Sequence, residues 1–165
     1  MPTDLYWING PWPGRLALSA RPRGGDWLES DIANWKRSGV DAILSLLTPD
    51  EELDLDLADE GATAKKHDVD FASFPIADRQ VPRSETLLRQ ILEKVNTTLL
   101  AGRNVLVHCR QGVGRTGLVV ACLLIRNGMS PGAAVEALST ARGVAVPETN
   151  EQREWIERFA PAFTK

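Results

Sequence analysis

The chain has 165 residues, a formal net charge of −3, and hydrophobic and charged fractions of 43% and 25% that are ordinary for a globular protein. The length predicts a single domain covering 1–165, and the slightly acidic balance argues against nucleic-acid binding. No apolar run approaches the roughly 18 residues of a transmembrane helix, and the N-terminal residues lack the basic and apolar segments of a signal peptide.

Two cysteines, Cys109 and Cys122, are too few for a disulfide framework. A loop and a helix separate them, so their Cα atoms should lie beyond the disulfide range of about 7 Å. We therefore expect two free thiols, which is typical of a cytoplasmic protein, and we expect Cys122 to be a core residue of its helix.

The first 25 residues predict a strand hairpin. Short apolar stretches at 5–8 and 15–20 flank a connection that is rich in Gly and Pro. The turn that follows contains Arg21 and Arg23. We expect these two side chains to be solvated, although their position also allows them to frame a site.

The next segment predicts a helix, a strand and a second helix. Asp26 is the expected N-cap of the first helix, and Gly39 ends it. The apolar residues 41–47 predict a buried strand, and the acidic stretch 50–68 predicts one helix whose charged face is solvated. His67 has no neighbours at metal-ligand spacing and is expected at the surface.

A strand at 69–74 leads into a loop bracketed by Pro75 and Pro82, and Asp78 stands in this loop. A carboxyl group on such a loop can protonate the leaving oxygen of a phosphoester. It can equally be a solvated loop residue, so the pattern alone leaves both interpretations of Asp78 open.

The rest of the chain predicts helices around one further strand. Ser84 is the expected N-cap of a helix that ends at Gly102 and carries one apolar stripe: Leu87, Leu88, Ile91, Val95 and Leu99. A strand at 104–108 precedes a helix to about Asn127, a helix at 133–142 and a last amphipathic helix. This order predicts an α/β fold with a central, mostly parallel sheet flanked by helices on both faces.

The strongest functional signal is His-Cys-Arg-Gln-Gly-Val-Gly-Arg-Thr-Gly at 108–117, between an apolar strand and an apolar helix. Its glycines let successive N–H groups point into one concavity at a helix N-terminus, which suits a phosphate-like dianion. Arg115 can grip two anion oxygens, and the same field favours the thiolate of Cys109 as a nucleophile. A structural Cys beside a Gly-rich turn is the alternative interpretation.

This motif resembles the signature of the cysteine-based protein tyrosine phosphatase superfamily, which is His-Cys, five residues, Arg, then Ser or Thr. Phe-Pro-Ile-Ala-Asp at 74–78 is similar to the general-acid loop of the dual-specificity branch, which includes kinase-associated-phosphatase-like enzymes. The resemblance covers about 15–160. It implies the protein tyrosine phosphatase fold and a phosphomonoester hydrolase that works through a phosphocysteine intermediate, with no metal or organic cofactor.

The resemblance also implies a role for each matching residue. Cys109 attacks phosphorus, and Asp78 acts first as general acid and then as base toward water. The phosphate oxygens are held by the loop residues Arg110, Gln111, Gly112, Val113, Gly114 and Arg115.

Three further residues match the family by type and position. Thr116 corresponds to the hydroxyl that donates to the sulfur of Cys109 and helps it leave. His108 corresponds to the buried residue that orients the loop through hydrogen bonds. Gln152, in the pattern Thr-x-x-Gln, corresponds to a glutamine that positions water in some members.

Several alternatives remain open at this stage. A rhodanese-like sulfurtransferase also uses Cys in an anion-binding loop, but it would need neither Asp78 nor Thr116. A phosphate-binding module without turnover would not need Cys, Arg and acid together. Phosphoinositides and RNA 5′-phosphates are possible substrates within the superfamily. Lipid-directed members often carry two basic residues in the loop, whereas this loop has Arg110 and Val113.

Specificity is predicted from what surrounds the motif. No segment similar to the Lys-Asn-Arg-Tyr type deepens the pocket, so we expect a shallow site that accepts phosphoserine, phosphothreonine and phosphotyrosine. Arg79, Arg83 and Arg110 could form a positive rim. The expected partner is a phosphoprotein or phosphopeptide, with no nucleic acid, no membrane and a monomeric state.

Overall fold

The structure is a computed structural model and describes residues 4–159. Its centre is a five-stranded sheet of β1 (Tyr6–Ile8), β2 (Leu16–Ala20), β3 (Ala42–Ser45), β4 (Asp70–Ser73) and β5 (Val105–Cys109). The strands lie in the order β1-β2-β5-β3-β4, and β1 runs antiparallel to β2 while the other neighbours are parallel. The predicted mostly parallel sheet and its entry hairpin are therefore confirmed.

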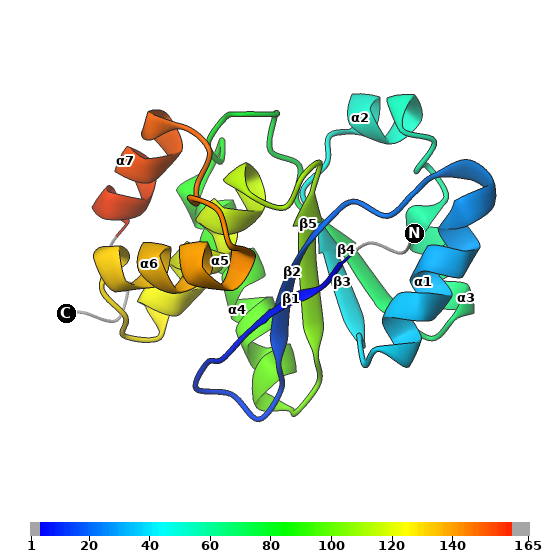
Figure 1. Ribbon diagram of the computed structural model, residues 1–165, viewed down its shortest axis with the longest axis horizontal. Helices are drawn as coiled ribbons and strands as arrows, with labels where there is room; N and C mark the ends of the chain where they lie inside the picture. The colour runs from blue at the N-terminus through cyan, green and yellow to red at the C-terminus, as the bar shows by residue number, and fades with distance from the viewer. Residues whose placement is uncertain (1–3, 160–165) are drawn as a thin grey trace.

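The helices are α1 (Leu28–Arg37, after the 3₁₀ turn Gly25–Trp27), α2 (Pro49–Asp54), α3 (Glu60–Lys66), α4 (Glu85–Leu100), α5 (Gly114–Arg126), α6 (Pro131–Arg142) and α7 (Asn150–Arg158). Figure 1 shows α1 and α3 on one side of the sheet, with α4, α5 and α6 on the other. Within residues 4–159, none of these helices is long and apolar enough to cross a bilayer.

The two helical layers bury two separate apolar clusters, one on each face of the sheet. Successive side chains of a strand point to opposite faces, and β5 follows this rule. Val105 and Val107 pack in the cluster that includes α4 and α5, whereas Leu106 packs with Ile32 and Trp35 of α1. Burial of β5 on both faces fixes its register between β2 and β3.

The sequence prediction of one helix at 50–68 is wrong. The chain forms α2 and α3, and between them it turns through Asp56, whose φ of +57° is left-handed. Leu57, just after this turn, is buried to 1% exposure. His67, at the C-cap of α3, lies near the surface as predicted.

Three smaller predictions also need correction. Asp26 is not an N-cap, because it lies inside the 3₁₀ turn and α1 begins at Leu28. Leu87 is 54% exposed, and Leu92 takes its place in the buried stripe of α4. Arg23 is only partly solvated, since its side chain is 31% exposed and forms an ion pair with the buried Asp31 at 2.7 Å.

Other local predictions are confirmed. The hydroxyl of Ser84 caps α4 by accepting from the N–H of Leu87. Cys109 and Cys122 are both free, and Cys122 is fully buried in α5, where burial raises the pKa of its thiol.

The parallel strands end at one edge of the sheet, and this edge positions the candidate site. Ala20 of β2 and Ser45 of β3 are the register partners of Cys109 and His108 in β5. The loops that follow β2, β3, β4 and β5 therefore emerge side by side. Ligands of open α/β sheets bind at such an edge.

Candidate active site

The Cys109 loop, residues 109–113, joins β5 to α5 at this edge. Gly112 has a φ of +76°, a left-handed conformation, and its N–H donates to Cys109 Sγ at 3.3 Å. A Cβ on this residue would lie 2.4 Å from the carbonyl oxygen of Ser19 in β2. Both the curl of the loop and its close packing against β2 therefore need glycine here.

The outer side of the loop is held by α6. Arg142 donates from Nε to the carbonyl of Gly112 and from Nη2 to the carbonyl of Gln111, both at 3.1 Å. Because a peptide group is planar and trans, a carbonyl turned outward sends the N–H of the next residue inward. Arg142 thus helps to direct the N–H groups of Gly112 and Val113 into the concave side of the loop.

A small pocket opens at the mouth of the loop, and the residues that line it come from three segments of the chain: Asp78, Cys109, Arg110, Gln111, Gly114, Arg115 and Glu148. All of these except Glu148 were predicted as site residues. Val113 does not line the pocket, because it is the N-cap residue of α5 and packs against the core. Cys109 itself is only 3% exposed.

Arg115, which is 2% exposed, is held by a set of charged and polar groups. Its Nη1 donates to Glu51 Oε1 at 2.6 Å and to the carbonyl of Ile76 at 2.8 Å. Its Nη2 donates to Glu51 Oε2 at 2.9 Å and to Asp78 Oδ1 at 3.1 Å. These bonds use four of the five N–H donors of the guanidinium group.

Glu51 is the buried partner of this arginine and also accepts from Arg110 Nε at 3.4 Å. Burial acts to raise the pKa of Glu51, but hydrogen bonds from Arg115 and from the backbone N–H of Thr48 outweigh it and lower the pKa to about 2. The carboxylate is therefore ionised at neutral pH. Glu51 therefore has no proton to give to a leaving group and is not a candidate general acid.

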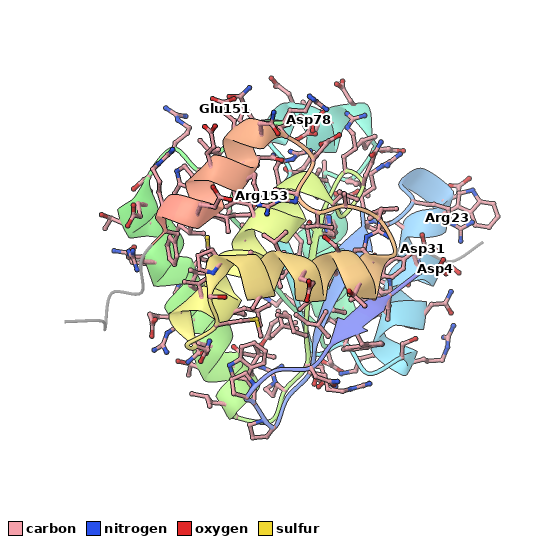
Figure 2. The ribbon with its side chains drawn as sticks, turned by 60° about the vertical axis from the view of Figure 1, so that its left-hand side comes forward. Asp4, Arg23, Asp31, Asp78, Glu151 and Arg153 are labelled. Carbon is pink, nitrogen blue, oxygen red and sulfur yellow. The ribbon has the colours of Figure 1, made fainter. Side chains whose placement is uncertain are left out.

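Asp78 differs from Glu51 in being accessible. Its side chain, labelled in Figure 2, is 51% exposed. It lines the pocket from the loop after β4. Asp78 Oδ1 accepts a hydrogen bond from Arg115 Nη2. An accessible carboxyl group beside the thiol of Cys109 can meet a bound substrate, which the buried Glu51 cannot do.

His108 lies behind the loop and is fully buried. Its Nε2 is 2.6 Å from Glu60 Oε2, and its Nδ1 is 3.3 Å from the carbonyl oxygen of Cys109. The ring thus joins α3 to the backbone of the loop, which agrees with an orienting role. Glu60 is equally buried, so the charged face expected to be solvated contains two buried carboxylates, Glu51 and Glu60.

Thr116 and Gln152 lie close to the pocket but do not line it. The hydroxyl of Thr116 is buried and has no hydrogen-bond partner among the described residues, so the predicted bond to Cys109 Sγ is not formed here. The side chain of Gln152 completes the capping box of α7 with Thr149 and donates from Nε2 to the carbonyl of Gln80 at 3.1 Å. Their catalytic roles stay predictions.

The sequence analysis missed four residues that shape the site: Glu51, Glu60, Arg142 and Glu148. Only Glu51 carried a signal, because Thr48-Pro-Asp-Glu is a capping-box pattern that directs this side chain back toward the helix start. Glu148 lines the pocket and pairs with Arg79 at 3.1 Å. Arg79 is thus neutralised within the predicted positive rim.

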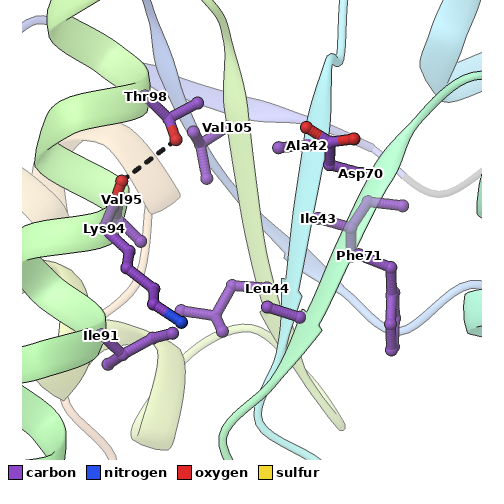
Figure 3. Close-up of a pocket in the computed structure, with 11 residues that line it drawn as sticks. Ala42, Ile43, Leu44, Asp70, Phe71, Ile91, Lys94, Val95, Thr98 and Val105 are labelled. Carbon is purple, nitrogen blue, oxygen red and sulfur yellow. Dashed lines mark hydrogen bonds between the residues drawn. The ribbon is translucent and has the colours of Figure 1, made fainter.

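A separate cavity, of about 170 Å³ and remote from the Cys109 loop in its lining, lies between α4 and the face of β3 and β4 (Figure 3). Its walls are mainly apolar, with Leu44 on the sheet and Ile91 and Val95 on the helix. The hydroxyl of Thr98 donates back to the carbonyl of Lys94 rather than into the cavity. Its lining includes no Cys, His or Arg, so it offers none of the chemistry found at the Cys109 loop.

Comparison with known proteins gives consistent matches. The model of the Swiss Army Knife protein DSP-PTPase phosphatase domain matches residues 4–157. Cyclin-dependent kinase inhibitor 3 of Rattus norvegicus is 27% identical over 134 residues, which are 80% of this chain and 63% of the relative. The Arabidopsis thaliana phosphatidylinositol 3,4,5-trisphosphate 3-phosphatase and protein-tyrosine-phosphatase PTEN1 is 36% identical over 94 residues, 53% of this chain and 22% of the relative.

Among solved structures, kinase-associated phosphatase with its catalytic-site cysteine replaced by serine superposes with a TM-score of 0.89. The two chains are 25% identical, and the match covers 96% of this chain and 94% of the other. The chain spans less than two thirds of the curated relatives above, yet it accounts for nearly all of this solved domain.

Proposed function

This chain belongs to the Swiss Army Knife DSP-PTPase phosphatase family, and on that premise we propose that it hydrolyses phosphomonoesters on protein side chains through a phosphocysteine intermediate. The observation that carries the proposal is the meeting of Cys109, Arg115 and Asp78 in one pocket at the carboxyl edge of the sheet. These are a nucleophile, an anion clamp and an acid, which together are sufficient for phosphoryl transfer.

In the first step the thiolate of Cys109 attacks phosphorus in line with the leaving oxygen. The S–P bond forms as the P–O bond breaks, and Asp78 gives its proton to the departing alkoxide or phenoxide. The inward N–H groups of the loop and the N-terminus of α5 stabilise the negative charge on the equatorial oxygens.

Arg115 must change partners when phosphate binds. Glu51 and the Ile76 carbonyl are buried and remain in place, whereas the accessible Asp78 can leave Nη2. Release of Asp78 frees that N–H, which together with Nε–H gives Arg115 two adjacent donors for two phosphate oxygens. The same movement sends Asp78 toward the leaving group.

In the second step water attacks phosphorus and the S–P bond breaks. Asp78, now ionised, takes the proton of the water, and the thiolate of Cys109 is regenerated. We assign Thr116 the hydroxyl that donates to the departing sulfur, which requires a rotation of its side chain from the position described. Gln152 would position the water. The reaction needs no metal or organic cofactor.

The substrate class follows from the same pocket. The pocket is small, with a volume of about 40 Å³. The sequence has no segment of the Lys-Asn-Arg-Tyr type that would deepen it, and this supports turnover of phosphoserine, phosphothreonine and phosphotyrosine. The Arabidopsis relative named as a phosphoinositide phosphatase keeps a lipid substrate as the second candidate. Within the loop, however, Arg110 is paired with Glu51 and Val113 is apolar, so a polyanionic headgroup would find little unpaired charge.

Several wider properties belong to the same proposal. The two apolar clusters share one sheet, which supports a single phosphatase domain over 1–165. The two free thiols suit a reducing, cytoplasmic location. We expect the protein to act as a monomer on phosphoproteins or phosphopeptides, with no nucleic-acid or membrane partner.

The test is turnover by purified wild type and Cys109→Ser on p-nitrophenyl phosphate, phosphopeptides, phosphoinositides and 5′-triphosphorylated RNA. Wild type should release phosphate from the first two, with inhibition by vanadate and none by EDTA. Cys109→Ser should lose turnover but still bind phosphate analogues. Faster turnover of a phosphoinositide than of any peptide would overturn the assignment to protein substrates.

A further inference from the structure

We propose that a second pocket beside the Cys109 loop, which we call the Trp27 pocket, receives an apolar side chain of the phosphoprotein substrate near the phosphorylated residue. The pocket is lined by Ala20, Arg21, Pro22, Arg23, Gly24, Trp27 and Leu55, and its volume is about 400 Å³. This size lies within the range of ordinary ligand pockets. The inference rests on the proposed function and specifies what the enzyme would recognise around the phosphate.

The Trp27 pocket lies beside the first two residues of the Cys109 loop. Ala20 is the strand partner of Cys109, and adjacent strands lie about 4.8 Å apart. Next to it, Arg21 donates from its backbone N–H and from Nη1 to the carbonyl of Arg110, at 3.4 and 2.9 Å. The strand pairing and these hydrogen bonds make the two pockets neighbours, although no residue lines both. An extended substrate segment can then reach from one to the other, since each residue spans about 3.3 Å.

Large apolar groups stand exposed at this place. The side chain of Trp27 is 58% exposed, and that of Leu53 on the neighbouring helix α2 is 71% exposed. The guanidinium of Arg23 lies 4.5 Å from the centre of the Trp27 ring, so one face of the ring is fixed by a cation–π contact. Trp and Arg are among the residue types that most often contribute the largest share of the binding energy at protein interfaces.

The walls of the pocket are rigid before any partner binds. Arg23 forms paired hydrogen bonds with the carboxylate of Asp31, which is 1% exposed, and its backbone N–H donates to the same group at 2.8 Å (Figure 2). Gly24 lies so close to the backbone of Leu55 that a Cβ would be 2.1 Å from that carbonyl oxygen. A preformed wall lowers the entropy cost of binding.

The charges around the pocket favour an apolar occupant over a second phosphate. Arg23 is neutralised by Asp31, and the carboxylate of Asp56 faces Gly25 at the rim. Asp26 stands exposed next to Trp27. A second anion would therefore meet repulsion from Asp26 and Asp56 as well as attraction from Arg21, whereas a Leu or Phe side chain would cover Trp27 and Leu55.

The experiment compares wild type with Trp27→Ala on p-nitrophenyl phosphate and on phosphopeptides. The peptides carry either Leu or Ser, one position at a time, within three residues of the phosphorylated residue. Wild type should prefer Leu at one position by about tenfold in kcat/KM, the effect of burying part of one apolar side chain. In Trp27→Ala that preference should fall to within about twofold, with turnover of the small substrate unchanged.

Leu87→Ala provides the matched control, because Leu87 is 54% exposed on α4 and does not line either pocket. This variant should keep the wild-type preference. Unchanged turnover of p-nitrophenyl phosphate by Trp27→Ala shows in the same assay that the variant is folded.

Any of the following results would overturn this inference and leave the proposed function standing: no preference for Leu in wild type, an undiminished preference in Trp27→Ala, or a stronger preference for a second phosphate. Equal losses on the small substrate and on all peptides would also overturn it, because Trp27 would then be structural. Absence of turnover on every substrate, with wild type folded, would instead refute the proposed function together with this inference.

Discussion

Replacing Glu51 by Gln tests the buried ion pair that holds Arg115. Glu51 accepts from Nη1 and Nη2 of Arg115 at 2.6 and 2.9 Å, and its side chain is 10% exposed. The amide of Gln keeps the shape of the carboxylate but removes its charge and turns an N–H toward one of the guanidinium nitrogens. Arg115 is then left buried with reduced compensation.

The loss of folding stability expected for Glu51→Gln follows from the lowered pKa of Glu51. Hydrogen bonds from Arg115 and Thr48 overcome the effect of burial and lower its pKa from 4.5 to about 2. At about 1.4 kcal/mol for each tenfold change, this difference corresponds to about 3 kcal/mol of folding stability. Solvent reaches the edge of the pair and screens part of it, so we expect Glu51→Gln to cost about 2–3 kcal/mol at pH 7.

The dependence on pH has a definite direction. A depressed pKa contributes stability that is complete above the unfolded value of 4.5 and is lost as the pH falls toward about 2. The free energy of unfolding of wild type should therefore approach that of Glu51→Gln as the pH falls. At pH 3 the difference between the two free energies should be about half its value at pH 7.

Urea unfolding at pH 7 and pH 3 measures both quantities. Glu93→Gln is the matched control, because Glu93 also makes two bonds to one arginine, Arg126, but its side chain is 57% exposed. This surface substitution should cost less than about 1 kcal/mol. The reasoning fails if Glu51→Gln costs no more than Glu93→Gln at pH 7, or if its gap to wild type is undiminished at pH 3.

Two further substitutions test the chemistry. Asp78→Asn should lower kcat by about two to four orders of magnitude on alkyl phosphates, and by much less on a substrate whose leaving group needs no proton. An equal loss on both substrate types, read from steady-state kinetics, would point to a different acid, and Glu148 is then the other carboxylate that lines the pocket. Arg115→Lys keeps the charge but cannot reproduce the four bonds to Glu51, Ile76 and Asp78, so kcat/KM should fall severely. Near-normal kinetics would contradict the assigned role of the guanidinium.

Much of the fold follows from short-range patterns. The apolar, β-branched run Val105–Val107 and the capping serine Ser84 predict elements that the structure contains, because strand propensity and cap chemistry act over a few residues. The motif at 108–117 predicts the Cys109 loop for the same reason. The Asp78 loop was predicted by its resemblance to a family rather than by physics.

The parts that could not be predicted depend on contacts between distant segments. Glu51 meets Arg115 64 positions along the chain, and Glu60 meets His108 48 positions away. In the sequence these two carboxylates look like members of a solvated acidic face. In the structure 50–68 forms two helices rather than one, and both carboxylates are buried near the sheet edge, one in α2 and one in α3.

The same dependence on distant contacts explains how Asp78 can move while its loop stays fixed. On one side of it, the carbonyl of Ile76 accepts from Arg115 at 2.8 Å, and Ile76 is fully buried. On the other side, the carbonyl of Gln80 accepts from Gln152, whose own side chain is locked in the capping box of α7. The segment between these two anchors is exposed, and Asp78 accepts a hydrogen bond from Arg115. Exchange of that arginine for a leaving oxygen therefore breaks one hydrogen bond and leaves both anchors intact. If Asp78 is the general acid as proposed, α7 contributes to catalysis by fixing the far end of the Asp78 loop, whether or not Gln152 also contacts water.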